Sequence, residues 1–237
     1  MIARYTRPEM GRIWSEENKY RQWLEVELAA AEALAETGEV PAEAARLLRQ
    51  HASCDAARID EIEREVKHDV IAFTTAVAES MAAAGHAEAS RWFHYGLTSN
   101  DVVDTAQALQ IGQASALIAQ ALEGLAETLK RRAFEFKHAV QIGRTHGVHA
   151  EPITFGLKLA LWHDEARRNL HRLAGAADQM RCGKISGVVG TFGHARPSRA
   201  LRLGAGAHLR HARTGALMIH RASGTSTVHA TPLANVG

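Results

Sequence analysis

The chain has 237 residues, of which 46% are hydrophobic and 23% are charged. This length and composition allow a sizeable buried core and exclude a chain that is disordered throughout. No apolar run approaches the roughly 18 residues that a membrane-spanning helix needs, and the N-terminal segment lacks the apolar run of a signal peptide. The only two cysteines, Cys54 and Cys182, cannot form a disulfide framework or a thiolate metal cluster. We therefore expect a cytoplasmic protein.

The net charge of +2 is an average over two unlike parts of the chain. Residues 1–192 contain 22 basic and 26 acidic residues, a net charge of −4, whereas residues 193–237 contain six arginines, five histidines and no acidic residue. This basic tail has neither helical nor strand periodicity, so we expect it to be irregular. Three interpretations of the tail remain open: a polyanion-binding segment, a linker, or the product of a frameshift in a GC-rich gene.

The dominant pattern before the tail is that of amphipathic helices, because apolar residues recur at steps of three and four. Strand-like alternation is nearly absent, so the predicted fold class is all-α. The first four predicted helices lie at about residues 20–35, from Pro41 onward, at 55–66 with Asp55 as the cap, and at 70–81. Gly38 and Gly85 are predicted to end the first and the last of these helices.

Two longer helices are predicted in the second half of the body. Residues Asn100 to Lys137 contain no proline and predict a single helix of about 38 residues, which would be about 57 Å long. Pro152 suits the first turn of the next long helix, whose apolar stripe runs from Phe155 to Leu173. Helices of this length expose more apolar surface than a lone chain can easily cover, so we expect a homo-oligomer.

Polar residues that suit binding are concentrated in the breaks between these helices. Lys67 and His68 offer hydrogen-bond donors to an anion, and Asp69 can cap the next helix or orient the imidazole. Thr98 or Ser99 is well placed to cap the longest helix, whose N-terminal N–H groups suit a carboxylate or a phosphate. Taken by itself, each of these segments is better explained by helix capping without any ligand.

Two further breaks carry chemically versatile residues. Arg144 can hold an anion, and His146 and His149 can transfer protons near neutral pH, although two structural histidines remain an alternative. A metal site built from the two histidines and Glu151 is disfavoured, because their spacing matches no helical zinc motif. Gly183–Thr191 has the composition of a phosphate loop but lacks the Gly-Lys-Ser/Thr ending, which argues against a nucleotide triphosphatase.

Five segments follow one another in a distinctive order. They are Arg4-Tyr5-x-x-Pro8-Glu9-Met10, Lys67-His68-Asp69-Val70, His94-x-Gly96-Leu97-Thr98-Ser99-x-Asp101-Val102-x-Asp104-Thr105, Gly143-Arg144-Thr145-His146-Gly147-x-His149-Ala150-Glu151-Pro152 and Gly183-Lys184-Ile185-Ser186-Gly187-x-x-Gly190-Thr191. Together they resemble the fumarase/aspartase superfamily and, within it, the adenylosuccinate lyase family. The resemblance covers residues 1–192. It implies an N-terminal helical domain at 1–95 and an incomplete central bundle of long helices at 96–192, followed by an unrelated tail at 193–237.

The resemblance implies a β-elimination in purine biosynthesis that releases fumarate from adenylosuccinate, giving AMP, and from SAICAR, giving AICAR. One group removes a proton from Cβ, another protonates the leaving nitrogen, and donors stabilise the added negative charge. The residue roles that it implies are general acid for His146, assistance or binding near the reacting nitrogen and the phosphate for His68, and nucleotide contact for Arg4 and Tyr5. It also implies phosphate contact for His94 and substrate binding for Lys67, Asp69, Thr98 and Ser99. It further implies a homotetramer that uses no cofactor and no metal.

One signature of that family is missing from this sequence, namely the Gly-Ser-Ser-x-x-Pro-x-Lys-x-Asn loop that carries the general-base serine. A frameshifted or prematurely ended lyase explains both this loss and the basic tail, so we expect little activity and poor solubility from the chain alone. The alternatives are another lyase of the superfamily, such as argininosuccinate lyase, or a non-catalytic helical interaction protein with a polyanion-binding tail. Neither a membrane nor a nucleic acid is the expected partner of the helical body.

Overall fold

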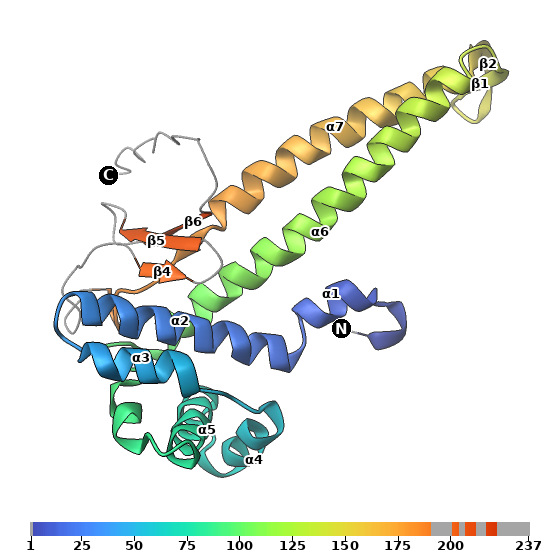
Figure 1. Ribbon diagram of the computed structural model, residues 1–237. Coiled ribbons are helices and arrows are strands. Elements are labelled where there is room, and N and C mark those ends of the chain that lie inside the picture. Colours follow the sequence, from blue (N-terminus) through green and yellow to red (C-terminus); the bar gives the residue numbers. More distant parts are fainter. Residues whose placement is uncertain (1, 191–200, 204–206, 212–216, 222–237) are drawn as a thin grey trace.

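The computed structural model describes residues 2–190 and the segments 201–203, 207–211 and 217–221, and its body is helical, which confirms the predicted all-α class (Figure 1). The helices are η1 (Ala3–Tyr5), α1 (Pro8–Ile13), α2 (Glu16–Glu36), α3 (Ala42–His51), α4 (Ala56–Val66), α5 (Asp69–Ala83), η2 (Ala87–Trp92), α6 (Ser99–Glu135) and α7 (Phe155–Gln179). The strands are β1 (Val140–Thr145), β2 (Val148–Thr154), β3 (Cys182–Gly183), β4 (Leu201–Leu203), β5 (Ala207–His211) and β6 (Leu217–Arg221). None of the helices in this part of the chain combines the length and the apolar character that a membrane crossing requires.

The ends of the N-terminal helices follow local capping chemistry. Asp55 precedes α4, and its Oδ1 accepts hydrogen bonds from the backbone N–H groups of Ala57 and Arg58 at 2.8 and 3.2 Å. Gly38, which has a φ of 78°, follows the end of α2 in the left-handed conformation that glycine adopts without strain. The predicted cap of α4 and the predicted end of α2 are therefore confirmed.

An aromatic cluster holds the N-terminal helices together. Phe73 of α5 is fully buried and stacks on Tyr20 of α2 with ring centroids 6.1 Å apart. Its ring also meets Trp23 edge-on at 5.5 Å and Phe93, which follows η2, at 5.7 Å. Aromatic pairs at these separations add to the stabilisation that burial provides. The cluster thus fixes α2 against α5 and against the segment that leads to α6.

Truncation of Phe73 is expected to destabilise this domain strongly. Phe73→Ala removes a buried ring that has three aromatic neighbours, and such changes cost about 3–5 kcal/mol of unfolding free energy. The matched control is Ile71→Ala on the same helix, where the side chain is 50% exposed and the expected change is within about 0.5 kcal/mol. Urea unfolding followed by tryptophan fluorescence measures both, and equal effects of the two changes would contradict the assigned core.

Helices α6 and α7 form a long two-helix arm that extends away from the N-terminal helices (Figure 1). Helix α6 has 37 residues, which corresponds to about 55 Å, and confirms the long helix predicted from the sequence. The first turn of α7 lies against the last turns of α6 at Gly156, where an added Cβ would come within 2.4 Å of the carbonyl oxygen of Ala133. A side chain at residue 156 would therefore separate the two helices.

The connection between α6 and α7 differs from the sequence prediction. Pro152 does not lie in the first turn of α7, as predicted, but in β2, opposite Ile142 of β1. Helix α7 begins only at Phe155, after Thr154, whose hydroxyl accepts a hydrogen bond from the N–H of Leu157 at 3.1 Å. The sequence did not predict this hairpin because neither of its faces is consistently buried, so no period-two pattern marks it. In a two-stranded ribbon each strand is an edge strand, where proline is tolerated.

Part of the basic tail forms strands rather than the expected irregular chain. Strands β4, β5 and β6 join β3 in an antiparallel sheet of order β3-β6-β5-β4. Backbone pairing of this kind satisfies N–H and C=O groups without requiring an alternating sequence, which is why periodicity did not predict it. The remainder of the tail lies outside the described residues.

Candidate active site

The start of α6 is one of the predicted binding segments. Thr98 occupies the N-cap, as predicted, and its backbone N–H donates to Oδ2 of Asp101 at 3.0 Å. Ser99 is the first helical residue and is partly exposed. The carboxylate of Asp101 favours the helix because it lies in the first turn, where the helix dipole is positive. Helix capping therefore explains why an acidic residue stands at position 101, while Ser99 stays accessible to a ligand.

Asp101 also anchors the loop that follows β3. Its fully buried carboxylate accepts hydrogen bonds from the backbone N–H groups of Ser186 and Gly187 and pairs with Nζ of Lys184 at 2.9 Å. Thr105 adds a second link, because its hydroxyl donates to the carbonyl oxygen of Lys184 at 3.0 Å. Two of the five motif segments thus meet at the start of α6. The loop N–H groups of Ser186 and Gly187 bind a protein carboxylate, which argues further against a phosphate loop.

His94 is held by a buried carboxylate of α2. Nδ1 of its imidazole lies 2.5 Å from Oε1 of Glu27, and its backbone N–H donates to Oε2 of Glu27 at 3.0 Å. The side chain of Glu27 is 0% exposed and that of His94 is 28% exposed. His94 adopts a φ of 60°, which non-glycine residues rarely adopt. The two hydrogen bonds hold the backbone and the ring of His94 in this conformation.

Glu27 and His94 shift each other's pKa. Burial raises the pKa of Glu27, although the hydrogen bonds and charge of His94 oppose that shift. Burial opposes protonation of His94, but its hydrogen bond to Glu27 and the negative charges of Glu27 and Asp101 outweigh burial and raise the pKa of His94. Both shifts favour retention of a proton between the two side chains near neutral pH.

Sequence reasoning missed Glu27. Its position on the apolar stripe of α2 was the available signal, because Trp23, Ala31 and Leu34 recur around it at helical spacing and are all buried. A carboxylate on a buried stripe requires a hydrogen-bonding partner. The pattern indicates that such a partner exists, but not that it is His94, which lies 67 positions further along the chain.

The Lys67–Asp69 segment joins α4 to α5. Lys67 has a φ of 55° and ends α4, while His68 occupies the N-cap of α5 and its Nδ1 accepts from the N–H of Ile71 at 3.4 Å. The predicted capping role of Asp69 is therefore wrong, because Asp69 is already the first helical residue. Its carboxylate lies 3.5 Å from Nδ1 of His68, and both side chains are about half exposed. The N–H of Ile71 thus holds the imidazole of His68 at the N-cap, and both side chains stay accessible.

His146 lies at the tip of the β1–β2 hairpin. Thr145 pairs with Val148, so His146 and Gly147 form a two-residue loop, with φ values of 50° and 75°. Two positive φ values define the type I′ turn that suits a tight hairpin. The side chain of His146 is exposed. The turn therefore leaves this imidazole accessible at the tip of the hairpin.

A cavity of about 600 Å³ lies at the base of the same hairpin. Its lining residues are Gln141, Ile142, Gly143, Arg144, Ile153, Leu157, Lys158 and Leu161. Arg144 and Lys158 supply two positive charges beside apolar walls, which suits an organic anion. Within the described residues, no cluster of three histidine, cysteine or acidic side chains is arranged to hold a metal ion. The metal interpretation of His146, His149 and Glu151 is therefore not supported.

Arg4 and Tyr5 belong to the short helix η1. The Arg4 guanidinium lies over the Tyr5 ring, 4.8 Å from its centroid, and Tyr5 is 75% exposed. Cation–π stacking organises the two side chains as one surface unit. An exposed aromatic ring beside a guanidinium suits contact with a nucleotide base and its phosphate.

A single copy of the chain does not bring all the predicted residues together. His94, Thr98 and Ser99 lie at the start of α6, whereas His146 lies in the hairpin beyond its end (Figure 1). The 37 residues of α6 place about 55 Å between these two ends. His68, at the start of α5, lies among the N-terminal helices, on the side of α6 remote from the hairpin (Figure 1). A site that uses both histidines must therefore combine different copies of the chain.

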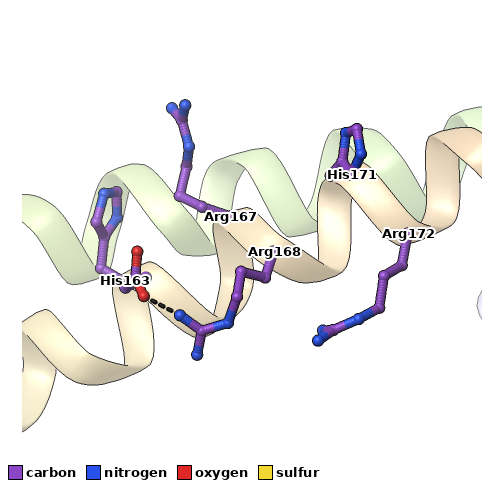
Figure 2. Close-up of a pocket in the computed structure, with 6 residues that line it drawn as sticks. His163, Arg167, Arg168, His171 and Arg172 are labelled. Atoms are coloured by element: carbon purple, nitrogen blue, oxygen red, sulfur yellow. Dashed lines mark hydrogen bonds and ion pairs between the residues drawn. The ribbon is translucent and has the colours of Figure 1, made fainter.

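A further pocket lies along α7, apart from the predicted site residues (Figure 2). Its lining residues are His163, Asp164, Arg167, Arg168, His171 and Arg172. Arg168 forms an ion pair with Asp164, and Nδ1 of His163 lies 2.9 Å from the carbonyl oxygen of Ala126. Every lining residue comes from one helix, so no second element encloses a ligand. We therefore do not assign the catalytic site to this basic surface.

Comparison with known proteins identifies the class. The sequence profile of the Lyase family matches residues 3–205, and the chain therefore belongs to the Lyase family. The match extends past residue 192 into the basic tail. In fold, the chain is similar to β-carboxy-cis,cis-muconate cycloisomerase from Acinetobacter calcoaceticus, with a TM-score of 0.73 and 28% identity over 78% of this chain and 44% of that one.

Within this class, sequence identity distinguishes the members better than the fold does. The chain is 52% identical over 197 residues to the adenylosuccinate lyase of Bacillus subtilis (strain 168) and also 52% identical over 197 residues to that of Streptococcus mutans serotype c. The resemblance to adenylosuccinate lyases predicted from the motifs is thereby confirmed. Each match covers 83% of this chain but 44% of the relative, so the chain spans less than half the length of the curated relatives it matches.

Proposed function

We propose that the chain supplies the N-terminal part of a cytoplasmic carbon–nitrogen lyase that releases fumarate from adenylosuccinate and from SAICAR in purine biosynthesis. The single observation that carries the proposal is the 52% identity to adenylosuccinate lyases over 197 residues, a stretch that includes nearly all of the described chain. Fold similarity alone favours no one member of the superfamily, because a cycloisomerase shares the fold at 28% identity.

In the proposed mechanism, His146 is the general acid. A histidine can protonate the leaving nitrogen near neutral pH, and the type I′ turn presents its imidazole at the hairpin tip. His68, held at the N-cap of α5 by its contact with the N–H of Ile71, assists near the reacting nitrogen. The remaining proposed roles are those of substrate contacts, assigned to Arg4, Tyr5, Lys67, Asp69, His94, Thr98 and Ser99. The cations, hydroxyls and helix N–H groups among them suit the phosphate and the carboxylates of the substrate, whereas the carboxylate of Asp69 can only accept hydrogen bonds from it.

We assign the role of general base to no residue of this sequence. Removal of the Cβ proton falls to a serine on a mobile loop in the resembling family, and the 237 residues contain no such signature. The electrons of the broken C–H bond form the double bond of fumarate as the C–N bond breaks, and the nitrogen receives its proton from the acid. The chain thus provides acid and binding groups, and we expect it to be inactive by itself.

Assembly into a homotetramer is part of the same proposal. The arm formed by α6 and α7 exposes large apolar side chains, with Phe134 70%, Leu157 62% and Leu161 62% exposed. Exposed apolar groups grouped along two helices are typical of an association surface. Association through the arm would also allow His146 of one copy to approach His68 of another. Light scattering on the intact enzyme tests this part, and a monodisperse monomer would contradict it.

The competing hypothesis is a non-catalytic helical protein that binds polyanions. The basic surface of α7 (Figure 2) and the six arginines of the tail give it a specific basis. Binding through phosphate contacts weakens steeply as salt is raised. Binding to DNA that depends on salt and is lost on removal of residues 193–237 would favour this alternative over the lyase.

A fusion protein tests the proposed activity. Residues 1–190 are joined to the part of the Bacillus subtilis relative that follows the position aligned with residue 190, and fumarate release from adenylosuccinate is measured. We expect the fusion to release fumarate and the 237-residue chain, purified free of host enzyme, to release none. A folded, tetrameric fusion without activity would contradict the assignment to adenylosuccinate cleavage. Activity of the 237-residue chain alone would contradict the inference that this chain lacks the general base.

A further inference from the structure

The buried pair of Glu27 and His94 is not explained by packing alone. A carboxylate that is 0% exposed is costly to bury, and an apolar residue at position 27 would fill the α2 stripe without that cost. Glu27 instead uses both of its carboxylate oxygens on one residue, Oε2 for the backbone N–H and Oε1 for Nδ1 of His94. The contact thus fixes both the backbone and the side chain of a single residue.

This arrangement determines which nitrogen of His94 faces a ligand. Because Nδ1 is bonded to Glu27, Nε2 is the ring nitrogen left for other partners, and the side chain is 28% exposed. His94 lies four residues before Thr98, at the start of α6. The N-terminus of α6, the hydroxyl of Ser99 and a protonated Nε2 all favour an anion.

We propose that Glu27 is a positioning residue that holds His94 as an imidazolium, with its Nε2–H available to the phosphate of the substrate. The naming of the ligand rests on the proposed function, whereas the effect of Glu27 on His94 does not. Neutral imidazole presents Nε2 as an acceptor when Nδ1 carries the proton, and an acceptor repels phosphate oxygens. Glu27 therefore controls whether this position attracts or repels the ligand.

The charges that act on the His94 ring come from two elements. Glu27 of α2 contacts it, and Asp101 of α6 acts on it at longer range. The charge of Asp101 is balanced by Lys184, whose Nζ lies 2.9 Å away. Replacement of Glu27 by glutamine keeps the size and a hydrogen-bonding oxygen but removes the adjacent charge. The pKa of His94 is then expected to fall, because the opposing effect of burial remains.

Histidine NMR on the full 237-residue chain tests the proposal without requiring turnover. The resonances of His94 are assigned by their loss in His94→Gln. In the unsubstituted chain, His94 is expected to titrate above 6.5, the ordinary value for histidine, and inorganic phosphate is expected to shift its Nε2 resonance. Glu27→Gln is expected to move the titration below that value and to weaken phosphate binding at pH 7.5 by about tenfold, the equivalent of one charged hydrogen bond. The exposed Glu36→Gln on the same helix is the matched control and is expected to change neither.

The pH dependence separates positioning from a merely structural role. If Glu27 acts through the charge of His94, phosphate binding by Glu27→Gln recovers at a pH below the lowered pKa, where the ring is protonated again. Loss of binding that does not recover at low pH would contradict the proposal. The unsubstituted chain provides a second test that does not depend on how the variants fold. The proposal is contradicted if His94 of that chain titrates at or below 6.5, or if phosphate leaves the His94 resonance unchanged. None of these measurements involves fumarate release. An inactive fusion protein would therefore count against the proposed lyase activity and not against the role of Glu27.

Discussion

Replacement of His146 by alanine in the fusion protein is expected to slow fumarate release by about 10²- to 10⁴-fold, the contribution typical of a positioned general acid. Without the imidazole, the departing nitrogen must take its proton from water. His146 is exposed at the hairpin tip and contributes no core contact, so we expect the loss in kcat with little change in stability. The rate of fumarate formation under saturating substrate measures the effect.

Two controls make this result specific. His146 adopts a φ of 50°, and asparagine tolerates that conformation better than alanine does. His146→Asn therefore removes the acid with less backbone strain and is expected to lose as much activity. His149→Ala changes the other exposed histidine of the hairpin and is expected to retain most of the activity. Near-normal turnover in both His146 variants would rule out the acid assignment, and an equal loss in His149→Ala would show that the hairpin as a whole is disturbed.

The helical body could be predicted from the sequence because its signals are local. The cap at Asp55, the left-handed Gly38 and the uninterrupted stretch that forms α6 each follow from short-range chemistry, and the structure agrees with all three. The β1–β2 hairpin could not be predicted in the same way. Its strands have no consistently buried face, and Pro152 carries opposite meanings at a helix start and in an edge strand.

The candidate site shows the limit of local reasoning more clearly. Thr98 or Ser99 was predicted as the cap from position alone, and Thr98 is the cap. Glu27 was missed because its role depends on His94, which comes near only when α2 packs beside the segment before α6. The predicted length of α6 already indicated that its two ends lie far apart. That His68 and His146 lie near opposite ends became clear only from the fold (Figure 1). Motif order therefore predicted, for a single site, residues that one copy of the chain does not bring together.

Mixing two inactive variants is expected to restore activity, and this result follows from the length of α6. In one variant of the fusion protein His68 is replaced by alanine, and in the other His146 is replaced by alanine. The 37 residues of α6 hold the two positions tens of ångströms apart in each copy. Each site must then draw His68 and His146 from different copies. After the two variants are unfolded together and refolded at equal concentrations, about one site in four contains both histidines if copies assemble at random in a symmetric oligomer.

Activity near a quarter of that of the unsubstituted fusion is therefore expected from the mixture, against losses of about 10²-fold or more for the separate variants. Refolding each variant alone is the first control, because it shows that the procedure itself restores nothing. The second control is the variant that carries both replacements, refolded together with the unsubstituted fusion. Random assembly then also leaves about a quarter of the sites complete, so this mixture calibrates how well the subunits mix. If the mixture of single variants stays inactive while this second mixture regains activity, both histidines act within one copy, and the extended arm could not be the arrangement of the working enzyme.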